Sequence, residues 1–144
     1  MRLSTKSRYA LEGLLYLAVY GGAGPLSVKE IASGIQVSPA YMEQIFVQLK
    51  RSGLIGTQRG SGGGFFLSRP EDTITVGKVI EILEGSTVPV RCVENRSSCS
   101  GRVRHCISRR VWVRVSDAIA ETANALTLKA IKDQFIAETG GAGK

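Results

Sequence analysis

The stretch "SVKEIASGIQVSPAYMEQIFVQLKRSGL", residues 27–54, decides the fold. Ser27 is followed three residues later by Glu30, and this spacing predicts a capping box at the start of a short helix. Ser38 and Pro39 predict the start of a second helix, because proline is tolerated at the first helical position. The second helix has an apolar stripe at helical spacing, formed by Met42, Ile45, Phe46 and Leu49.

The turn between these two helices is expected at Gly34, and Gly53 is expected to end the second one. Two short helices joined by such a turn predict a helix-turn-helix. The next segment, "LIGTQRGSGGGFFLSRP", predicts a β-hairpin with strands at about 54–59 and 64–68 around a glycine-rich tip. A helix-turn-helix followed by such a hairpin is typical of a winged helix.

The flanking segments extend this pattern with more helices. Leucines at helical spacing predict a helix over 4–20, and Thr75 is expected to cap another. A helix from about 106 to 126 is longer than the small body can bury, and a chain this short often gains stability by dimerising. The predicted fold is therefore mainly α with a small β-hairpin, a winged helix-turn-helix plus a long C-terminal dimerisation helix. The predicted division is 1–84 for DNA binding, 85–105 for a cysteine-containing loop, 106–136 for the dimerisation and C-terminal helices, and 137–144 for a disordered tail.

Composition narrows the class of protein. The chain has 144 residues and a formal net charge of +7, which favours a polyanionic partner, with nucleic acid first. No membrane span is expected, and we place the protein in the cytoplasm. A single histidine, with no Ser/His/Asp set and no paired carboxylates, predicts neither an enzyme nor a small-molecule substrate.

A helix-turn-helix reads double-stranded DNA through the N-terminal part of its second helix, which enters the major groove. Lysine and arginine near the helix ends suit phosphates, and an arginine on a slim wing suits the minor groove. The predicted DNA-binding residues are Arg2, Lys6, Ser38, Ala40, Tyr41, Gln44, Lys50, Arg51, Arg59 and Ser61. The alternative is that the helix-turn-helix is a docking surface of an adaptor that controls a partner enzyme.

The cysteines form a second pattern, C-x6-C-x6-C, at Cys92, Cys99 and Cys106. Serine, asparagine and glycine between them predict a polar loop and not a helix. Three thiols surrounded by arginines favour an iron–sulfur cluster or a redox-active thiol set, because arginine stabilises the thiolate. Zinc ranks third, since the tight CxxC spacing of zinc sites is missing.

The segments "MRLSTKSRYALEGLLYLA", "SVKEIASGIQVSPAYMEQIFVQLKRSGLI" and "RGSGGGFFLSRP", with three late cysteines, resemble the IscR-like family of winged-helix regulators over about residues 1–126. The resemblance implies a homodimer joined through the long helix, a [2Fe–2S] or [4Fe–4S] cluster on the three cysteines, and cluster-controlled operator binding. We favour [2Fe–2S] and the branch that represses iron–sulfur assembly genes. A metal-free thiol sensor or a nitric-oxide sensor of the same fold is the alternative.

The fourth cluster ligand remains open at this point. The family's histidine shortly after the third cysteine is missing, and Arg8 stands where the nitric-oxide branch has an acidic residue. Glu43 is the preferred candidate, because a carboxylate on the recognition helix would otherwise face phosphates. The equally weighted alternative is that Glu43 accepts a hydrogen bond from cytosine or discriminates between operators. The other candidates are His105, Glu94 and Glu12.

Overall fold

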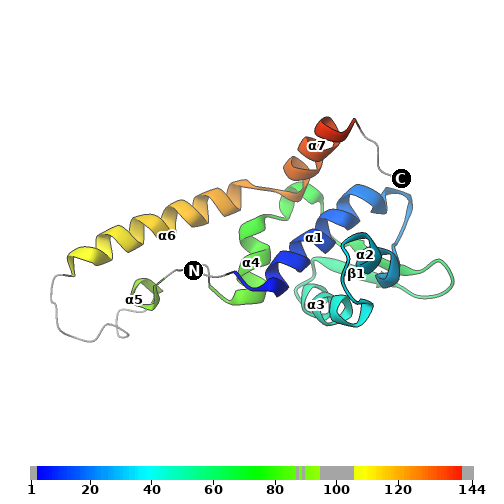
Figure 1. Ribbon diagram of the computed structural model, residues 1–144, viewed down its shortest axis with the longest axis horizontal. Helices are drawn as coiled ribbons and strands as arrows, with labels where there is room; N and C mark the ends of the chain where they lie inside the picture. Colours follow the sequence, from blue (N-terminus) through cyan, green and yellow to red (C-terminus); the bar gives the residue numbers. More distant parts are fainter. Residues whose placement is uncertain (1–2, 87, 89, 95–105, 141–144) are drawn as a thin grey trace.

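The structure is a computed structural model, and it describes residues 3–86, 88, 90–94 and 106–140. The helices are α1 (Thr5–Tyr20), α2 (Val28–Gly34), α3 (Pro39–Arg51), α4 (Val76–Glu84), α5 (Arg91–Glu94), α6 (Ile107–Ala125) and α7 (Leu128–Thr139). Two short 3-10 turns, η1 (Gly21–Ala23) and η2 (Glu71–Thr73), and the strands β1 (Ile55–Gln58) and β2 (Gly64–Leu67) complete the described elements. Figure 1 shows a body built around α1, from which α6 projects to one side.

The predicted helix starts of the helix-turn-helix are confirmed. The Ser27 backbone N–H donates to Glu30 Oε2 at 2.8 Å, and the Glu30 N–H donates to Ser27 Oγ at 3.2 Å. These two bonds form the capping box of α2, and hydrogen bonding to Ser27 lowers the pKa of Glu30. Ser38 Oγ accepts the Tyr41 N–H at 3.2 Å at the start of α3, whose first residue is Pro39.

The turn between α2 and α3 differs from the prediction. Gly34 is still helical, and the residue with left-handed backbone is Gln36, at φ 59°. Gly34 is needed for another reason: a Cβ there would lie 2.1 Å from the ring of Tyr16. The glycine therefore permits close packing of α1 on α2, while glutamine accepts the backbone conformation that favours glycine.

The core of the body lies between α1, α2, α3 and α4. The predicted stripe of α3 is completely buried, with Met42, Ile45, Phe46 and Leu49 all at 0% exposure. Leu14 from α1 and Ile31 from α2 are buried against it. Each such side chain contributes about 1.5–3 kcal/mol by leaving water, so this cluster fixes the recognition helix in the body.

The wing is a two-stranded antiparallel hairpin, with Ile55 opposite Leu67 and Gln58 opposite Gly64. Strand β1 begins and ends one residue inside the predicted limits, whereas β2 begins at the predicted residue and ends one residue earlier, which is within the usual fraying of strand ends. Leu26 adds a bridge on the other side of β2: its N–H donates to the Phe65 carbonyl at 2.9 Å, and the reverse bond is 2.8 Å. The hairpin is therefore attached to the segment that leads into α2.

The two C-terminal helices, α6 and α7, lie in different parts of the structure. Figure 1 shows α6 extending away from the body and α7 lying beside α1. The long helix predicted over 106–126 is confirmed as α6, with Cys106 at its N-cap. Helix α7 begins after its N-cap Thr127 and ends at Gly140, which has left-handed backbone conformation. Residues 137–139, which were assigned to the disordered tail, are therefore helical.

The cysteine segment is only partly described. Cys92 lies in the four-residue helix α5, so the prediction of a loop is wrong for residues 91–94. Packing of α5 on α6 accounts for this helical turn, because tertiary contacts override weak local propensity. Cys99 and His105 lie outside the described residues. None of the helices in the described part of the chain combines the length and apolar character that a membrane span requires.

Candidate nucleic-acid interface and cysteine region

The N-terminal part of α3 presents an exposed polar face. Ser38, Ala40 and Gln44 are exposed, and Gln44 carries an amide that can pair with adenine in two hydrogen bonds. Ser38 Oγ accepts the capping bond, and its hydroxyl hydrogen remains able to donate to a phosphate. Tyr41 is half-buried against Tyr9 of α1 in an edge-to-face pair with ring centroids 6.0 Å apart. The contact with Tyr9 therefore restricts the orientation of the Tyr41 ring.

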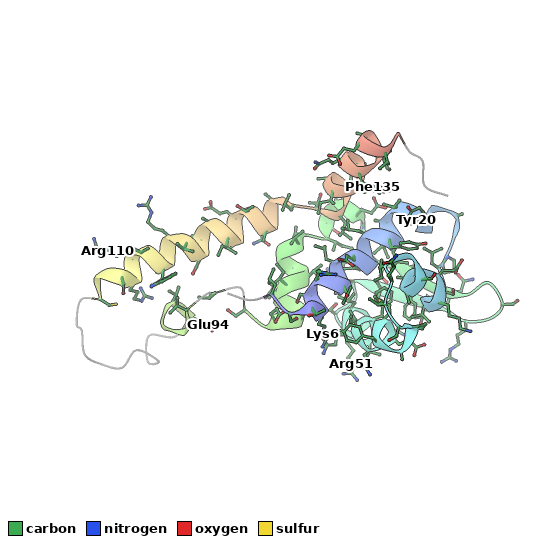
Figure 2. The ribbon with its side chains drawn as sticks, viewed as in Figure 1. Lys6, Tyr20, Arg51, Glu94, Arg110 and Phe135 are labelled. Carbon is green, nitrogen blue, oxygen red and sulfur yellow. The ribbon has the colours of Figure 1, made fainter. Side chains whose placement is uncertain are left out.

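The C-terminal end of α3 is tied to the wing. Lys50 Nζ donates to Thr57 Oγ1 of β1 at 2.8 Å, a contact that spacing along the sequence did not indicate. Arg51 is exposed, and Figure 2 shows it on the same edge of the body as Lys6 of α1. These cations together offer phosphate contacts from two helices.

The wing tip carries the two remaining predicted contacts. Arg59 and Ser61 are both exposed between the strands. Gly60 and Gly62 have φ values of 102° and 78°, which side-chain-bearing residues rarely adopt. The glycines give the tip a narrow profile, and Arg59 is the cation that such a tip would carry into a minor groove.

The start of α1 is attached to the end of α4 by Glu84, a residue that the sequence did not indicate. Glu84 Oε1 accepts the Ser4 N–H at 3.0 Å and also accepts the hydroxyls of Ser4 and Ser7. The hydroxyl of Ser4 first, then that of Ser7, lowers the pKa of Glu84. This cluster orients the first turn of α1, which carries half-buried Lys6. Arg2 lies outside the described residues.

Cys106 is half-buried at the N-cap of α6. Its Sγ lies 3.1 Å from Ser108 Oγ, and this hydrogen bond, followed by the Arg109 backbone N–H, lowers the pKa of the Cys106 thiol. Arg109 Nε, in the same first turn, is buried and has no hydrogen-bond partner among the described residues. A thiolate-favouring cysteine beside an unsatisfied cationic donor suits an anionic, sulfur-ligated centre.

Two other proposed ligands, Cys92 and Glu94, belong to α5. Helix α5, which contains Cys92, packs on α6, and its Glu94 is exposed. Within the described residues, no group of three or more His, Cys, Asp or Glu side chains is positioned to hold a metal ion. The donor chemistry around Cys106 fits a cluster, and Cys92 and Cys99 would have to supply the further thiolates.

Glu43 is exposed on α3, and the described fold keeps it away from Cys106 of the same protomer. Figure 1 shows α3 in the body and the start of α6 at the end of that helix that lies farthest from the body. Two elements that lie apart in one view are at least that far apart in space. Glu12 forms a 3.1 Å ion pair with Arg8. A role for Glu43 as ligand therefore requires the cysteines of a second protomer.

Comparison with known proteins gives a consistent set of relatives. Residues 3–134 match the Rrf2 family, described as iron-dependent transcriptional regulators. The transcriptional regulator IscR of Pectobacterium atrosepticum is 37% identical over 128 residues, which cover 89% of this chain and 77% of that protein. The transcriptional regulator CymR of Bacillus subtilis is 36% identical over 129 residues, covering 90% and 88%.

Solved structures agree with the fold. The structure of CymR, the global cysteine regulator of B. subtilis, has a TM-score of 0.81 at 34% identity and covers 93% of this chain and 98% of that chain. The structure of T. potens IscR has a TM-score of 0.77 at 30% identity and covers 100% and 93%. These matches confirm the predicted winged-helix fold and the resemblance to IscR-like regulators.

The comparisons also confirm that the protein is a regulator and not an enzyme, because its relatives are transcriptional regulators. Membership of such a family implies DNA binding. Relatives named IscR and CymR are about equally similar, so similarity alone does not separate their sensing roles. The match over residues 3–134, the relatives and the solved structures together establish that the chain belongs to the Rrf2 family of transcriptional regulators.

Proposed function

We propose that the protein is a cytoplasmic, dimeric repressor whose three cysteines hold an iron–sulfur cluster, preferably [2Fe–2S], and that it controls iron–sulfur assembly genes. The observation that carries the proposal is the surroundings of Cys106. Its thiol pKa is lowered by Ser108, and Arg109 Nε, in the first turn of the same helix, is buried and has no hydrogen-bond partner within the part of the chain that the structure describes. Such an environment favours a metal-ligating thiolate over a buried structural thiol.

The DNA-binding part of the proposal rests on three groups of exposed residues. Gln44 stands on the outward face of α3, Arg51 lies at its end, and Arg59 is at the wing tip. In a winged helix these positions correspond to base edges, phosphates and minor groove, respectively. The net charge of +7 supplies the long-range attraction to the duplex.

The dimer part rests on an apolar stripe and an apolar groove. Helix α6 exposes Val111, Trp112 and Val115 at 57%, 39% and 37%. A groove of about 360 Å³ between the starts of α1 and α4 is lined by apolar side chains that include Leu3, Leu11, Val76, Val79 and Ile80. In a two-fold dimer, the exposed stripe of one copy can pack into the apolar groove of the other copy. The proposed partner is therefore a second copy of this chain.

A bound cluster would add a metal centre that is lost when iron is short or oxidants attack. The chain's own contribution is to supply thiolates and to hold them at the tip of α6. The hydrogen bond with Ser108 and the backbone N–H of Arg109 lower the pKa of the Cys106 thiol and so favour its thiolate form, and α5 packs on α6. Because α6 is also the proposed dimer helix, the state of the cysteines and the arrangement of the two DNA-reading surfaces share one structural element.

The test is purification without oxygen, followed by visible absorption and by iron and acid-labile sulfide assays. We expect a coloured protein with iron and sulfide in near-equal amounts, and a colourless Cys106→Ala variant that keeps its helical circular dichroism. Gel shifts on duplexes selected from a random library should then differ between the cluster-loaded and metal-free forms. A protein that stays metal-free after reconstitution, or that binds duplexes identically in both forms, contradicts the proposal.

The fourth ligand is tested separately. Glu43→Ala should change the visible and resonance Raman spectra if Glu43 of the second protomer completes the coordination. Glu43→Gln is the matched control, since it keeps the size of the side chain and removes the carboxylate. An unchanged spectrum in both variants excludes Glu43, and Glu94→Ala is then the next variant to record.

A metal-free thiol sensor is the second candidate, and the same thiol favours it. A cysteine with a lowered pKa at a partly exposed helix start is suited to oxidation. One relative of known structure, CymR of Staphylococcus aureus, has been solved in an oxidized form. If the anaerobic protein is colourless and peroxide alone alters its duplex binding in a Cys106-dependent way, this candidate replaces the cluster.

A further inference from the structure

The junction of α6 and α7 is joined to the start of α4 by a short antiparallel bridge between Thr75 and Thr127. The Val76 N–H donates to the Leu126 carbonyl at 2.9 Å, and the Leu128 N–H donates to the Ile74 carbonyl at 2.9 Å. These are the hydrogen bonds of a strand pair, formed here between two inter-helix connections. The C-terminal end of α6 is therefore fixed to the body through its backbone.

A contact between side chain and backbone lies directly beside this bridge. Gly77 of α4 is buried, and a Cβ at this glycine would lie 2.2 Å from Asn124 Oδ1 and 2.8 Å from Asn124 Cγ. Thr75 Oγ1 donates to the same Asn124 oxygen at 3.4 Å, and Ala123 is only 7% exposed. The amide of Asn124 thus occupies the space that a Cβ at position 77 would need. Because the Asn124 side chain is exposed it can turn aside, and the backbone carbon of Ala123, 3.3 Å from the same Cβ, is the fixed neighbour.

Helix α7, which follows the junction, also fixes the C-terminal end of α6 to the body. Leu128 is completely buried in the core, and Lys132 Nζ forms a 2.8 Å ion pair with Glu71 of η2. Helix α6 is consequently held firmly at its C-terminal end, and Figure 1 shows its other end projecting away from the body. The angle between α6 and the body at this junction determines where the body lies relative to the rest of α6.

The length of α6 makes this angle important. Its 19 residues span about 28 Å at 1.5 Å per residue. A tilt of about 10° at one end displaces the other by about 5 Å, which exceeds the ~3.4 Å rise of one base-pair step. If two copies are joined through α6, the same tilt moves each α3 relative to its partner.

We infer that Gly77 and Asn124 are positioning residues that set the angle between α6 and the body, and with it the operator half-site spacing that the dimer accepts. The inference rests on the proposed function as a dimeric DNA-binding regulator. Neither residue has to touch DNA, since both act through the placement of α3.

The experiment starts from a duplex that the wild-type protein selects out of a random library. Gel shifts then use versions of this duplex with the centre shortened or lengthened by one or two base pairs. The variants are Gly77→Val, which pushes against Asn124 and the backbone of Ala123, and Asn124→Ala, which removes the amide without adding bulk. Gly21→Ala is the matched control, because a Cβ there meets no atom within 4 Å.

We expect Gly77→Val to move the preferred spacing or to lose at least fivefold in affinity at the wild-type spacing. The double variant Gly77→Ala with Asn124→Ala should show the profile of Asn124→Ala without the change in spacing expected for Gly77→Val, because the nearest remaining contact of the new Cβ is Ala123 C at 3.3 Å. Asn124→Ala alone should flatten the profile severalfold, and Gly21→Ala should leave it unchanged.

A folded Gly77→Val variant with the wild-type spacing profile overturns the inference and leaves the proposed function standing. If that variant fails to fold by circular dichroism, Asn124→Ala decides, and an unchanged profile there overturns the inference equally. If the wild-type protein selects no duplex at all, the proposed function fails and the inference fails with it.

Discussion

Lys50 Nζ lies 2.8 Å from Thr57 Oγ1, and this hydrogen bond connects the last turn of the recognition helix to the first strand of the wing. The two elements therefore present their cations to a duplex as one surface. Both side chains are exposed, so the lysine can exchange this bond for a phosphate contact without leaving a buried group unsatisfied.

This pair gives the first prediction. Lys50→Gln should weaken duplex binding about equally for all sequences and lower the salt slope of log Kd by about 1, because one phosphate contact is lost. Thr57→Val, the matched change, keeps the cation and should keep the slope. The measurement is a gel-shift titration at several salt concentrations. Equal slopes for wild-type and Lys50→Gln proteins would mean that Lys50 serves the wing alone.

The second prediction concerns pH and Glu84. Hydrogen bonds from Ser4 and Ser7 lower the pKa of Glu84 in the folded state. The carboxylate therefore contributes stability that is fully present above the unfolded value of about 4.3, and that is lost as the pH falls toward the folded value. Glu84→Gln should lower the urea midpoint at pH 7, and the difference from wild type should shrink below about pH 4.3.

Glu81→Gln is the control for this comparison. Glu81 lies on the same helix and pairs with Lys78, with both side chains more than half exposed, so the change should be nearly neutral. Urea unfolding of the three proteins at pH 7, 5, 4 and 3 measures the effect. A Glu84→Gln difference that stays constant across this range would contradict the assigned linkage.

The parts of the fold that the sequence predicted depend on neighbouring residues. The capping box of Ser27 and Glu30 and the N-cap of Ser38 involve bonds over three positions, so their spacing alone indicates them. The apolar stripe of α3 was likewise predictable from its period. Gln36 was not, because its left-handed backbone is imposed by the packing of α2 on α3 and not by its own preference.

The features that the sequence did not reveal join distant positions. Glu84 meets Ser4 across 80 positions, and Asn124 meets Thr75 across 49. A single sequence carries no signal for such contacts, since neither a period nor a motif links the partners. The same holds for Arg109, whose unsatisfied Nε is known only once its burial is known. The ligand set beyond Cys106 stays a prediction from the spacing of the cysteines.

The third prediction concerns the anchor of α7. Leu128 is 0% exposed and lies in the same core as Ile74. Leu128→Ala should reduce the free energy of unfolding by about 2–5 kcal/mol, because burial is lost and a cavity remains. Ile136→Ala on the same helix, where the side chain is 38% exposed, should cost much less. Urea unfolding followed by circular dichroism compares the two, and similar losses would show that α7 is not anchored by its first residue.

The fourth prediction concerns the exposed stripe of α6. Val115 is 37% exposed on the face that also carries Val111, whereas Glu121 is exposed and lies about 120° around the same helix from Val115. Val115→Lys should convert the proposed dimer to a monomer, since an ammonium group would be buried among apolar side chains without a partner. Glu121→Lys changes the net charge more and should leave the dimer intact, so it separates an effect of the stripe from an effect of added charge. Sedimentation velocity measures both variants, and circular dichroism checks that each remains helical. Monomer formation by Glu121→Lys but not by Val115→Lys would place the interface on the other face of α6, and dimers in both cases would place it off this helix altogether.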